Sequence, residues 1–461
     1  MPPTWQVCRL GDVFDYGAAR KAEPIEIPPS AWVLELEDIE KDTSKVLQRI
    51  TFAERRSKST KNCFSAGDIL YGKLRPYLNK VVLADEDGFC TTEIVPLSSS
   101  PWVDNRYLFH WLKHPAFLDY VSAVSHGLNM PRLGTEAGRA APLVIAPYAE
   151  QKRIADKLDA VLARVDACRE RLDRVPAIIK RFRQSVLAAA TSGALTEDWR
   201  GENPLPDGCS EREVAEYLEL RGRRQGTQRK FKDPVAPDLT NWHLDAPASW
   251  SVQSISAYAE CLDHLRVPVT RSERSKAKGL YPYYGANGQV DIVDEYIFDD
   301  DLVLVTEDET FYGREKPIAY RVSGRCWVNN HAHVLLAGDS DRADYLCFCL
   351  MYYNVLPWLT GTTGRAKLTQ GVLNTLPIAV PPQKEIVEIV RRVENLFAYA
   401  DRLEARYKTA REQVERLTPA LLAKAFRGEL VTQDPNDEPA SVLLERLRGH
   451  RVETPPDRRR R

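Results

Sequence analysis

The chain has 461 residues, 28% of them charged, and a formal net charge of −1. This length is too great for one hydrophobic core and predicts several domains. The near-neutral charge argues against indiscriminate binding to nucleic acid but allows local basic patches. Since no apolar run approaches the roughly 20 residues of a membrane helix and no signal-peptide core follows Met1, we expect a cytoplasmic protein that does not associate with membranes.

Residues 1–147 predict a globular α/β domain. Short apolar stretches at 68–71, 81–84 and 93–97 have the composition of strands, and the pattern at 107–122 indicates a helix. Two loops of this domain combine basic, aromatic and amide side chains, which are the groups that contact phosphates and base edges. The candidate nucleic-acid-binding residues in these loops are Lys73, Arg75, Tyr77, His126, Asn129 and Arg132.

A long amphipathic helix is predicted over 148–200, followed by a linker over 201–245 that is rich in Pro, Gly and charge. The apolar residues of the helix recur at alternating spacings of four and three, which is the heptad pattern of a coiled coil. We expect Pro176 to kink or locally unwind the helix and Gly193 to lie at its carboxyl end. Its seam residues include Ile154, Leu158, Val165, Leu172, Ile179, Phe182 and Val186.

Residues 246–382 predict a second globular α/β domain. Strand-like stretches occur at 302–306, 318–322 and 333–336, and a helix is expected at 345–356. The loops again combine tyrosines, amides, hydroxyls and basic residues with glycines that permit close approach. The candidates here are Tyr283, Tyr284, Asn287, Gln289, Tyr312, Arg314, Lys316, Thr362, Thr363, Arg365 and Lys367.

A second long helix is predicted over 383–430, followed by a C-terminal tail over 431–461. It carries the same heptad seam, interrupted only by Lys424, and Pro419 is expected to disturb it as Pro176 disturbs the first helix. Its seam residues include Ile389, Val393, Leu396, Leu403, Val414, Leu417 and Leu421.

The second helix repeats the first at an offset of 235 residues. The correspondence needs no gap from Leu133, which matches Leu368, to Leu195, which matches Leu430. Because an apolar stripe is stable only when another surface covers it, and the second copy is the obvious cover, the two helices predict an intramolecular coiled coil. The expected fold is therefore a tandem repeat of α/β (α+β) domains and long helices.

The sequence shows no motif of catalysis or of a bound cofactor. It lacks a phosphate-binding glycine loop, a zinc-protease helix and a nucleophile elbow. The nine cysteines form no matched CxxC pairs, and His331 and His333 would share a strand face without a third ligand. The acidic run at 299–301 lacks the spacing that gathers carboxylates around one ion. We predict no catalytic residue, no metal and no cofactor.

Two unlike globular domains on a fixed spacer imply a partner with two unlike patches at a fixed separation. Double-stranded DNA offers such patches one or two helical turns apart. Two alternatives remain at this point: a structural coiled coil whose domains bridge other proteins, and a nuclease-type enzyme with its own metal site.

Five segments of the sequence are distinctive beyond their heptad pattern: EQKRIADKLDAVLARVD at 150–166, VLAAATSGALTEDWR at 186–200, YYGANG at 283–288, EIVRRVENLF at 388–397 and AFRGEL at 425–430. With these segments the sequence resembles, over nearly its whole length, the specificity subunits of type I restriction-modification systems. One departure is the Pro-Pro-Gln-Lys segment at 381–384, which replaces the more usual Pro-Pro-x-x-Glu-Gln approach to the second helix.

This resemblance implies a non-catalytic subunit in which each globular domain recognises one half of an asymmetric, two-part DNA sequence. It implies that the helices pair antiparallel as a spacer and that modification subunits, two of them, dock on this scaffold. In the family those subunits bind S-adenosylmethionine and methylate adenine, while a restriction subunit, where present, uses ATP and cuts. The expected partners are double-stranded DNA and these subunits.

Overall fold

The computed structural model describes residues 1–98, 100–127, 129–225, 233–274, 279–308, 311–359 and 366–453. It divides into two compact units. Unit 1 comprises Met1–Asp173 and Lys408–Arg461, and unit 2 comprises Arg174–Tyr407. In these described ranges, no helix has both the length and the apolar character needed to cross a membrane.

The globular part of unit 1 contains three small sheets. Strands β1 and β9 form an antiparallel pair, a four-stranded sheet has the order β2-β4-β7-β3, and a three-stranded sheet has the order β6-β5-β8. The strands are β1 (Gln6–Arg9), β2 (Lys21–Ala22), β3 (Val33–Leu34), β4 (Lys61–Phe64), β5 (Ile69–Gly72), β6 (Val81–Leu83), β7 (Gly88–Cys90), β8 (Ile94–Leu97) and β9 (Pro142–Ile145).

Short helices surround these sheets, and two long helical segments complete the unit. The helices are α1 (Leu10–Val13), α2 (Phe52–Arg55), α3 (Asn105–Leu112), α4 (Pro115–Val124), α5 (Thr135–Ala140), α6 (Tyr148–Asp173), the part of α14 after residue 407, and α15 (Ala440–Glu453). Single 3₁₀ turns lie at Pro24–Glu26, Leu36–Asp38 and Pro76–Leu78.

The three strands predicted in the first domain correspond to β5, β6 and β8, but the single helix predicted at 107–122 is wrong. It is two helices, α3 and α4, separated at Lys113 and His114. Pro115 is the cause, because its ring excludes the helical conformation for the preceding residue. His114 accordingly has extended dihedrals, with φ −69° and ψ 140°, and caps α4.

Unit 2 is built around one six-stranded sheet of order β11-β16-β14-β15-β12-β13, with a separate antiparallel pair of β10 and β17. The predicted strands correspond to β14, β15 and β16. The strands are β10 (Ser251–Ser254), β11 (Glu260–Cys261), β12 (Tyr281–Gly285), β13 (Gly288–Val293), β14 (Phe298–Thr306), β15 (Ala319–Val328), β16 (Ala332–Leu336) and β17 (Pro377–Val380).

The helices of unit 2 are α7 (Val175–Ser192), α8 (Glu197–Glu202), α9 (Cys209–Gln225), α10 (Ile255–Tyr258), α11 (Arg271–Arg274), α12 (Ser340–Leu350), α13 (Gln370–Thr375) and the first part of α14 (Gln383–Phe426), with 3₁₀ turns at Ala194–Thr196, Asp263–Leu265 and Leu356–Trp358. The helix predicted at 345–356 therefore begins and ends earlier than expected. Asp339 caps its start by accepting a hydrogen bond from the Arg342 backbone N–H.

Both units contain the same strand pair and the same buried hydrogen bond. The pair β1 and β9 in unit 1 corresponds to β10 and β17 in unit 2, and both pairs are antiparallel. The Trp5 indole donates to Glu150 Oε2 at 2.9 Å, and the Trp250 indole donates to Glu385 Oε2 at 2.8 Å. These bonds fix the start of a long helix to the strand pair of its own unit.

The second oxygen of each buried glutamate has a different partner. Glu385 Oε1 accepts from Thr196 at 2.7 Å and pairs with Arg200, whereas Glu150 Oε1 accepts from Gln433. Burial raises the pKa of Glu150, against the lowering effect of its hydrogen bonds. Thr196 and Arg200 follow the carboxyl end of α7, and Gln433 follows the carboxyl end of α14. In each unit, the segment after one long helix therefore bonds to the glutamate at the start of the other.

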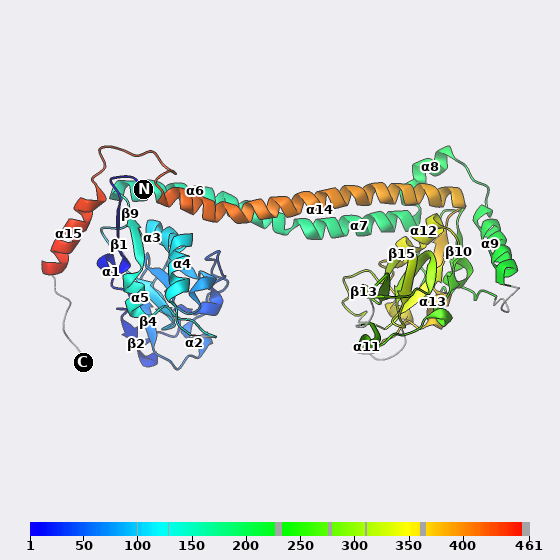
Figure 1. Cartoon of the computed structure of the whole chain (residues 1–461), viewed down its shortest axis with the longest axis horizontal. Coiled ribbons are helices and arrows are strands. Elements are labelled where there is room, and N and C mark those ends of the chain that lie inside the picture. The colour runs from blue at the N-terminus through cyan, green and yellow to red at the C-terminus, as the bar shows by residue number, and fades with distance from the viewer. Residues whose placement is uncertain are drawn as a thin grey trace. The chain divides into compact units, whose positions relative to one another are not determined.

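Each unit contains an antiparallel helix pair formed by one segment from each long helix (Figure 1). In unit 2, α7 lies beside the first part of α14. Arg392 bonds to Asp198 at 2.6 Å, and Arg183 bonds to Asp401 at 2.6 Å. Partner numbers fall as the numbers along α14 rise, which confirms the expected antiparallel direction. In unit 1, α6 lies beside the last part of α14 (Figure 1).

The apolar seams stabilise this pairing more than the ion pairs do. A partly exposed ion pair contributes about 0–1 kcal/mol, whereas full burial of a leucine or isoleucine side chain contributes about 1.5–3 kcal/mol. Of the predicted seam, Ile154, Leu158, Val165, Ile179, Val186, Ile389 and Val393 are buried, Leu172, Phe182, Leu396, Leu403, Val414 and Leu421 are half-buried, and Leu417 is 43% exposed.

The exposure of Leu417 shows that the heptad register shifts toward the end of α14. A straight helix has 3.6 residues per turn, so a seven-residue repeat drifts around its surface by about 20° per heptad. Burial passes accordingly to Leu422, which is 2% exposed, and to Ala425 and Phe426. Leu417 was therefore wrongly predicted as a seam residue.

The two prolines have different effects. The first helix is broken between α6 and α7, and Pro176 occupies the first turn of α7, where a missing N–H costs least. In contrast, α14 continues as one helix of 44 residues through Pro419. The expected interruption is thus present in the first helix, whereas the second helix shows no break in its helical assignment.

The segments that follow the long helices return to the globular parts. In unit 2, Ser210 at the start of α9 donates to the Val380 carbonyl at 2.7 Å. In unit 1, the sequence predicted a tail over 431–461, but α15 lies within it and buries Leu443, Leu444 and Leu447 in the core of the unit.

Four aromatic rings pack at one point of unit 1, and we call them the aromatic cluster: Tyr107, Trp111, His114 and Phe426. The Phe426 ring lies 5.0 Å from Tyr107, 5.0 Å from Trp111 and 5.3 Å from His114, measured between ring centroids. The last residue of α14 thereby joins the helix pair to α3 and to the residue that caps α4.

His114 must be neutral in this cluster. Its Nδ1 accepts a hydrogen bond from the Ala116 backbone N–H at 3.1 Å. Burial lowers the pKa of His114 to about 4, the charge of Arg427 acts in the same direction, and Asp119 opposes it. Because the folded-state pKa lies below the ordinary value of 6.5, the stabilisation is complete above about pH 6.5 and is lost as the pH falls toward about 4.

We predict that His114→Asn, which keeps a capping acceptor but cannot titrate, flattens part of the acid destabilisation. Thermal unfolding of the wild type and the variant should be measured between pH 7.5 and about pH 4. The wild type should lose more stability across this interval, because His114 becomes protonated in the unfolded state while it stays neutral in the folded state. Parallel curves for the two proteins would contradict the prediction.

Candidate nucleic-acid interface

In unit 1 the two loops with candidate residues lie against each other. The Leu133 N–H donates to the Lys73 carbonyl at 2.9 Å, and the Arg75 N–H donates to the Pro131 carbonyl at 2.7 Å. These bonds join the loop that follows β5 to the loop that follows α4. The structure therefore brings the candidates of the first domain together, although they are distant in sequence.

Arg75 is the most unusual residue of this surface. Its φ of 49° and ψ of 60° lie in the left-handed region, which costs a non-glycine residue roughly 1–3 kcal/mol. Its Nε atom is buried, and no hydrogen-bond partner for it occurs among the described residues. Arg132, in contrast, is neutralised by Glu93 at 3.0 Å. A strained backbone that holds an incompletely bonded guanidinium is a feature of binding sites.

In unit 2 the turn between β12 and β13 is hydrogen-bonded to the end of β14. The Thr306 hydroxyl donates to the Ala286 carbonyl at 2.8 Å. Beside this turn, Arg314 Nη2 donates to Asn287 Oδ1 at 2.7 Å and to the Pro317 carbonyl at 2.9 Å. The predicted Asn287 and Arg314 are thus direct neighbours, and the arginine fixes the orientation of the amide.

A second group of side chains gathers around Asp308. Its carboxylate accepts from His331 Nδ1 at 2.8 Å and lies 3.7 Å from the Lys367 ammonium. The Leu368 N–H donates to the Glu307 carbonyl at 2.9 Å, which brings the segment before α13 to the end of β14. The cation of Lys367 is therefore partly neutralised, which the sequence did not indicate.

The exposure of the candidates separates them into classes. Tyr77, His126, Asn129, Arg132, Asn287, Gln289, Tyr312, Lys316 and Lys367 are exposed, Lys73, Arg75, Tyr284 and Arg314 are half-buried, and Thr362, Thr363 and Arg365 lie outside the described residues.

Tyr283 is not available to stack on a base, contrary to the prediction. Its side chain is 2% exposed, and its hydroxyl accepts a hydrogen bond from the Val269 N–H at 3.3 Å. The Arg274 guanidinium lies 4.8 Å from the ring centroid. Neighbouring residues of a strand face opposite sides of a sheet, and here Tyr283 faces the buried side whereas Tyr284 is half-buried.

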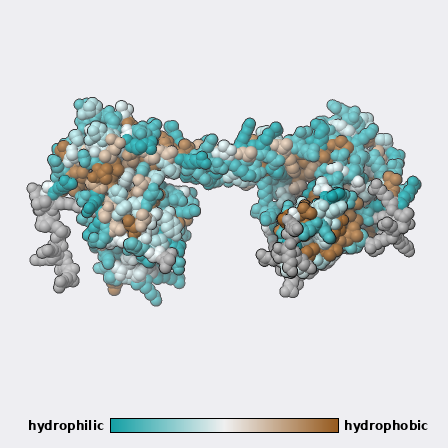
Figure 2. All heavy atoms as spheres, in the orientation of Figure 1, coloured by the Kyte–Doolittle hydropathy of each residue, from teal (hydrophilic) through white to brown (hydrophobic). Residues whose placement is uncertain are grey.

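An apolar strip along β13 was missed by the sequence analysis. Val290 and Ile292 are 59% and 45% exposed, and the neighbouring Leu280 and Tyr296 are 73% and 40% exposed. Figure 2 shows hydrophobic side chains gathered on unit 2 in the region where Figure 1 places β13. The alternation of apolar residues within 288–293 was the signal, because a period of two is typical of an edge strand with one distinctive face.

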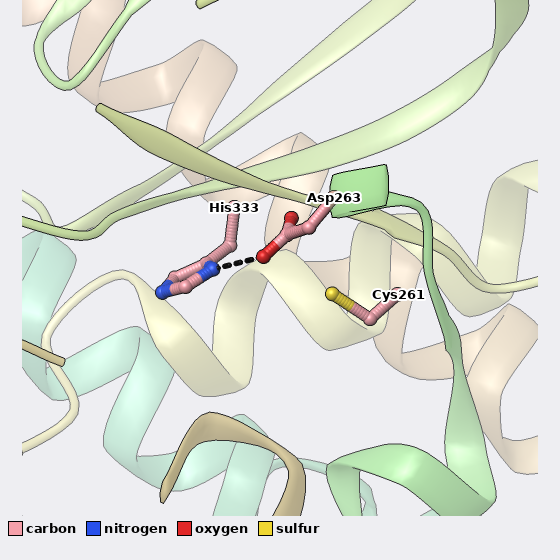
Figure 3. A group of neighbouring side chains, drawn as sticks. All are labelled: Cys261, Asp263 and His333. Carbon is pink, nitrogen blue, oxygen red and sulfur yellow. Dashed lines mark hydrogen bonds and ion pairs between the residues drawn. The ribbon is translucent and has the colours of Figure 1, made fainter. Parts of the chain in front are cut away.

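The described residues contain one group with the residue types of a metal site, Cys261, Asp263 and His333, whose ligand atoms lie within 4.8 Å of one another (Figure 3). His333 Nδ1 faces Asp263 Oδ2 at 2.5 Å, while its Nε2 faces the Leu368 carbonyl at 2.6 Å. Two acceptor oxygens require a proton on both ring nitrogens, which leaves no lone pair for a metal.

The other two groups are equally unsuited to a metal. Arg266 lies 3.2 Å from the Asp263 carboxylate, and burial raises the pKa of the Cys261 thiol to about 12. To bind a metal, the cysteine would have to be a thiolate, and the aspartate would need a carboxylate oxygen that is not paired with an arginine. We interpret the group as a buried His–Asp ion pair that holds the start of β16 against the turn after β11.

The acidic run in β14 is also bonded within the protein. Asp299 pairs with Arg325 at 3.0 Å, and Asp301 pairs with Arg321 at 3.3 Å across the sheet. The Ser323 hydroxyl donates to Asp301 at 2.6 Å, and this bond is the main cause that lowers the pKa of Asp301. Asp299 lies directly opposite Arg325 on β15, and Asp301 lies opposite Ser323, so each of these two carboxylates is bonded across the strand pair rather than to a shared ion.

Comparison with known proteins identifies the family. The family model for the type I restriction modification DNA specificity domain matches residues 2–177 and 264–413. The chain is 30% identical over 381 residues to the type I restriction enzyme StySPI specificity subunit of Salmonella potsdam, covering 77% of this chain and 74% of that protein. It is 28% identical over 359 residues to the EcoKI specificity subunit of Escherichia coli strain K12, covering 75% and 72%.

Solved structures show the same fold. A chain from a study of complex assembly and conformational transition of the type I restriction-modification system matches with a TM-score of 0.63 and 17% identity, covering 93% of this chain and 99% of that one. The HsdS subunit from Thermoanaerobacter tengcongensis matches with a TM-score of 0.54 and 19% identity, covering 93% and 98%. The chain therefore belongs to the family of type I restriction-modification specificity subunits, the non-catalytic subunits of those systems.

Proposed function

We propose that this chain gives a type I restriction-modification complex its DNA sequence specificity. Unit 1 recognises one half of an asymmetric, two-part site in double-stranded DNA, and unit 2 recognises the other half. The observation that carries the proposal is that each unit gathers basic and amide side chains from separate loops, while the strand pair and helix beneath them are repeated. Repeated scaffolds with unlike loops suit a target with two unlike halves.

In unit 1 the central DNA contact is Arg75. In the part of the chain that the structure describes, Arg75 forms no ion pair and its Nε atom has no hydrogen-bond partner. Such a guanidinium keeps its attraction for phosphate and can bond a guanine edge through two donors. The backbone bonds that Lys73 and Arg75 make to the second loop fix the backbone from which both side chains project before binding. Such prior order reduces the conformational entropy lost on association.

In unit 2 the base contact is Asn287. An asparagine amide can bond adenine through two hydrogen bonds, provided that its orientation is defined. Arg314 defines it by bonding Oδ1, and Arg314 itself supplies positive charge beside the turn. The exposed Lys316 adds a contact to the phosphate backbone, and Lys367 adds a weaker one because Asp308 partly neutralises its charge.

The proposed partners, besides DNA, are two modification subunits that methylate adenine and, where one is present, a restriction subunit. The similar curated proteins are specificity subunits of type I restriction enzymes, which supports this assignment. The proposed location is the cytoplasm, because the proposed DNA and protein partners lie there. The alternative of a coiled coil that bridges other proteins is not favoured, because the family match extends over both globular parts.

We predict that Arg75→Ala lowers the affinity of the assembled complex for its DNA at least ten-fold. Loss of a bidentate base contact costs about 1–3 kcal/mol, which relaxes the choice of one base, whereas loss of a phosphate contact lowers the salt-dependence slope by about 0.9. Equilibrium binding at several salt concentrations distinguishes these two roles. Arg49→Ala is the matched control, because Arg49 is neutralised by Asp85 and Glu86. Equal effects of both substitutions would refute the role of Arg75.

Asn287→Ala should relax the sequence requirement in one half of the site and leave the other half unchanged. The physical reason is that the amide distinguishes bases, whereas phosphate contacts do not. Sequencing of methylated adenines in DNA treated with the complex reads both halves at once. Relaxation in both halves, or in neither, would show that Asn287 is not a base-reading residue.

The helix pair is proposed to set the distance between the half-sites. Four residues inserted in α14 near residue 407 add about 6 Å of helix, which is comparable to the rise of one to two base pairs at about 3.4 Å each. The methylated site should then lengthen in its central gap only. The same insertion after Arg174, where the first helix is already broken, is the control and should change the gap less. An unchanged gap in the first variant would contradict the proposal.

A further inference from the structure

Unit 2 contains an apolar pocket of about 430 Å³ between α7, α12 and the segment that leads to β10. None of the described residues that line it carries a charge. Leu187 at its floor is 4% exposed, whereas Tyr352 at its rim is 36% exposed. The side chains used in the argument below are Thr191, Trp242, Leu244, Cys349, Tyr352 and Tyr353.

The internal repeat identifies the equivalent place in unit 1. The Tyr107 hydroxyl donates to the Val144 carbonyl at 3.1 Å, and the Tyr345 hydroxyl donates to the Ala379 carbonyl at 2.6 Å. Val144 and Ala379 are related by the offset of 235 residues that relates the two long helices. Tyr107 and Tyr345 therefore occupy equivalent positions.

Counting from these tyrosines gives the other equivalent residues. Four residues later lie Trp111 in unit 1 and Cys349 in unit 2, and seven residues later lie His114 and Tyr352. Along the helices, Phe426 is equivalent to Thr191. Hence Trp111, His114 and Phe426, which touch one another in unit 1, correspond to three residues that line the pocket in unit 2.

The pocket lies where unit 2 has no counterpart to the Phe426 ring. The hydrogen bond of Trp111 is kept by another ring, because the Tyr353 hydroxyl donates to the Pro377 carbonyl at 3.0 Å as the Trp111 indole donates to the equivalent Pro142 carbonyl at 2.8 Å. A cysteine stands where unit 1 has Trp111, and a threonine stands where it has Phe426, while the surrounding framework is kept. Protein interiors normally fill such space, because apolar surface left without contact loses dispersion and hydrophobic stabilisation. The equivalent place in unit 1 is filled by the Phe426 ring. An apolar hollow left open in unit 2 therefore indicates that another molecule fills it.

We infer that this pocket receives an apolar, ring-bearing side chain of a partner protein, and that the partner is the modification subunit. This inference rests on the proposed function. The ring of Phe426 in unit 1 indicates the chemistry of the occupant, and the uncharged lining excludes phosphate. Trp242, Tyr352 and Tyr353 belong to the residue types that dominate binding energy at protein interfaces. A second hollow of about 500 Å³ continues from Trp242 and Tyr353 to Trp358, which suits an extended protein surface.

One consequence is that the two units offer unequal docking surfaces. Unit 1 fills its position with its own Phe426, and unit 2 leaves the position open. If two modification subunits bind, the subunit that docks on unit 2 gains a buried anchor that the other one lacks. The first subunit to bind should therefore bind more tightly than the second.

The test is the Thr191→Phe substitution, which gives unit 2 the ring that unit 1 already has. Titration of the purified full-length chain with the purified modification subunit should show at least a ten-fold loss of affinity at the tighter site. Ser185→Phe is the matched control, because it adds the same ring to an exposed position of α7 outside the pocket. Its affinity should stay within about two-fold of the wild type.

Thermal unfolding of both variants checks that the fold is retained. Tyr352→Ala, at the exposed rim, gives an independent test and should also weaken binding. A folded Thr191→Phe protein, or a folded Tyr352→Ala protein, that binds the modification subunit as the wild type does would overturn the inference alone. A folded wild-type chain that binds no modification subunit would overturn the proposed function, and the inference with it.

Discussion

The structure depends on the mutual cover of two apolar helix faces. Neither long helix can expose its seam to water, and each finds its cover in the other copy. Because the helices run antiparallel, each unit takes one segment from each of them, and α14 contributes its first part to unit 2 and its last part to unit 1. Unit 1 is therefore built from two separate pieces of chain and unit 2 from one continuous piece, and each unit contains a segment of both long helices.

The duplicated parts and the divergent parts of the molecule have different physical roles. The strand pair, the Trp–Glu hydrogen bond and the helix seam recur in both units, since they determine how a globular part is attached to a helix. Apart from this strand pair the sheets differ, with a four-stranded and a three-stranded sheet in unit 1 and one six-stranded sheet in unit 2. Loops carried on unlike sheets can present unlike surfaces, while the attachment beneath them stays the same.

Neighbouring charges decide which candidate residues retain binding capacity. Arg132 and Lys367 each lie beside a carboxylate, and Asp308 is shared with His331. The same reasoning argues against the His333 group as a metal centre, because both ring nitrogens of His333 face acceptor oxygens and the Asp263 carboxylate lies beside Arg266. By residue type alone, these basic side chains would be expected to bind DNA equally well. The carboxylates beside them make their binding capacities different.

The sequence alone determined the repeat, the heptad helices, the family resemblance and six of the strands, because these depend on local periodicity and on matches along the chain. Tertiary structure decided what depends on neighbours from distant segments: the burial of Tyr283, the neutralisation of Lys367, the shift of the seam past Leu417, and the pocket beside Thr191. A side chain's surroundings are formed by residues far away in sequence, and no local pattern encodes them.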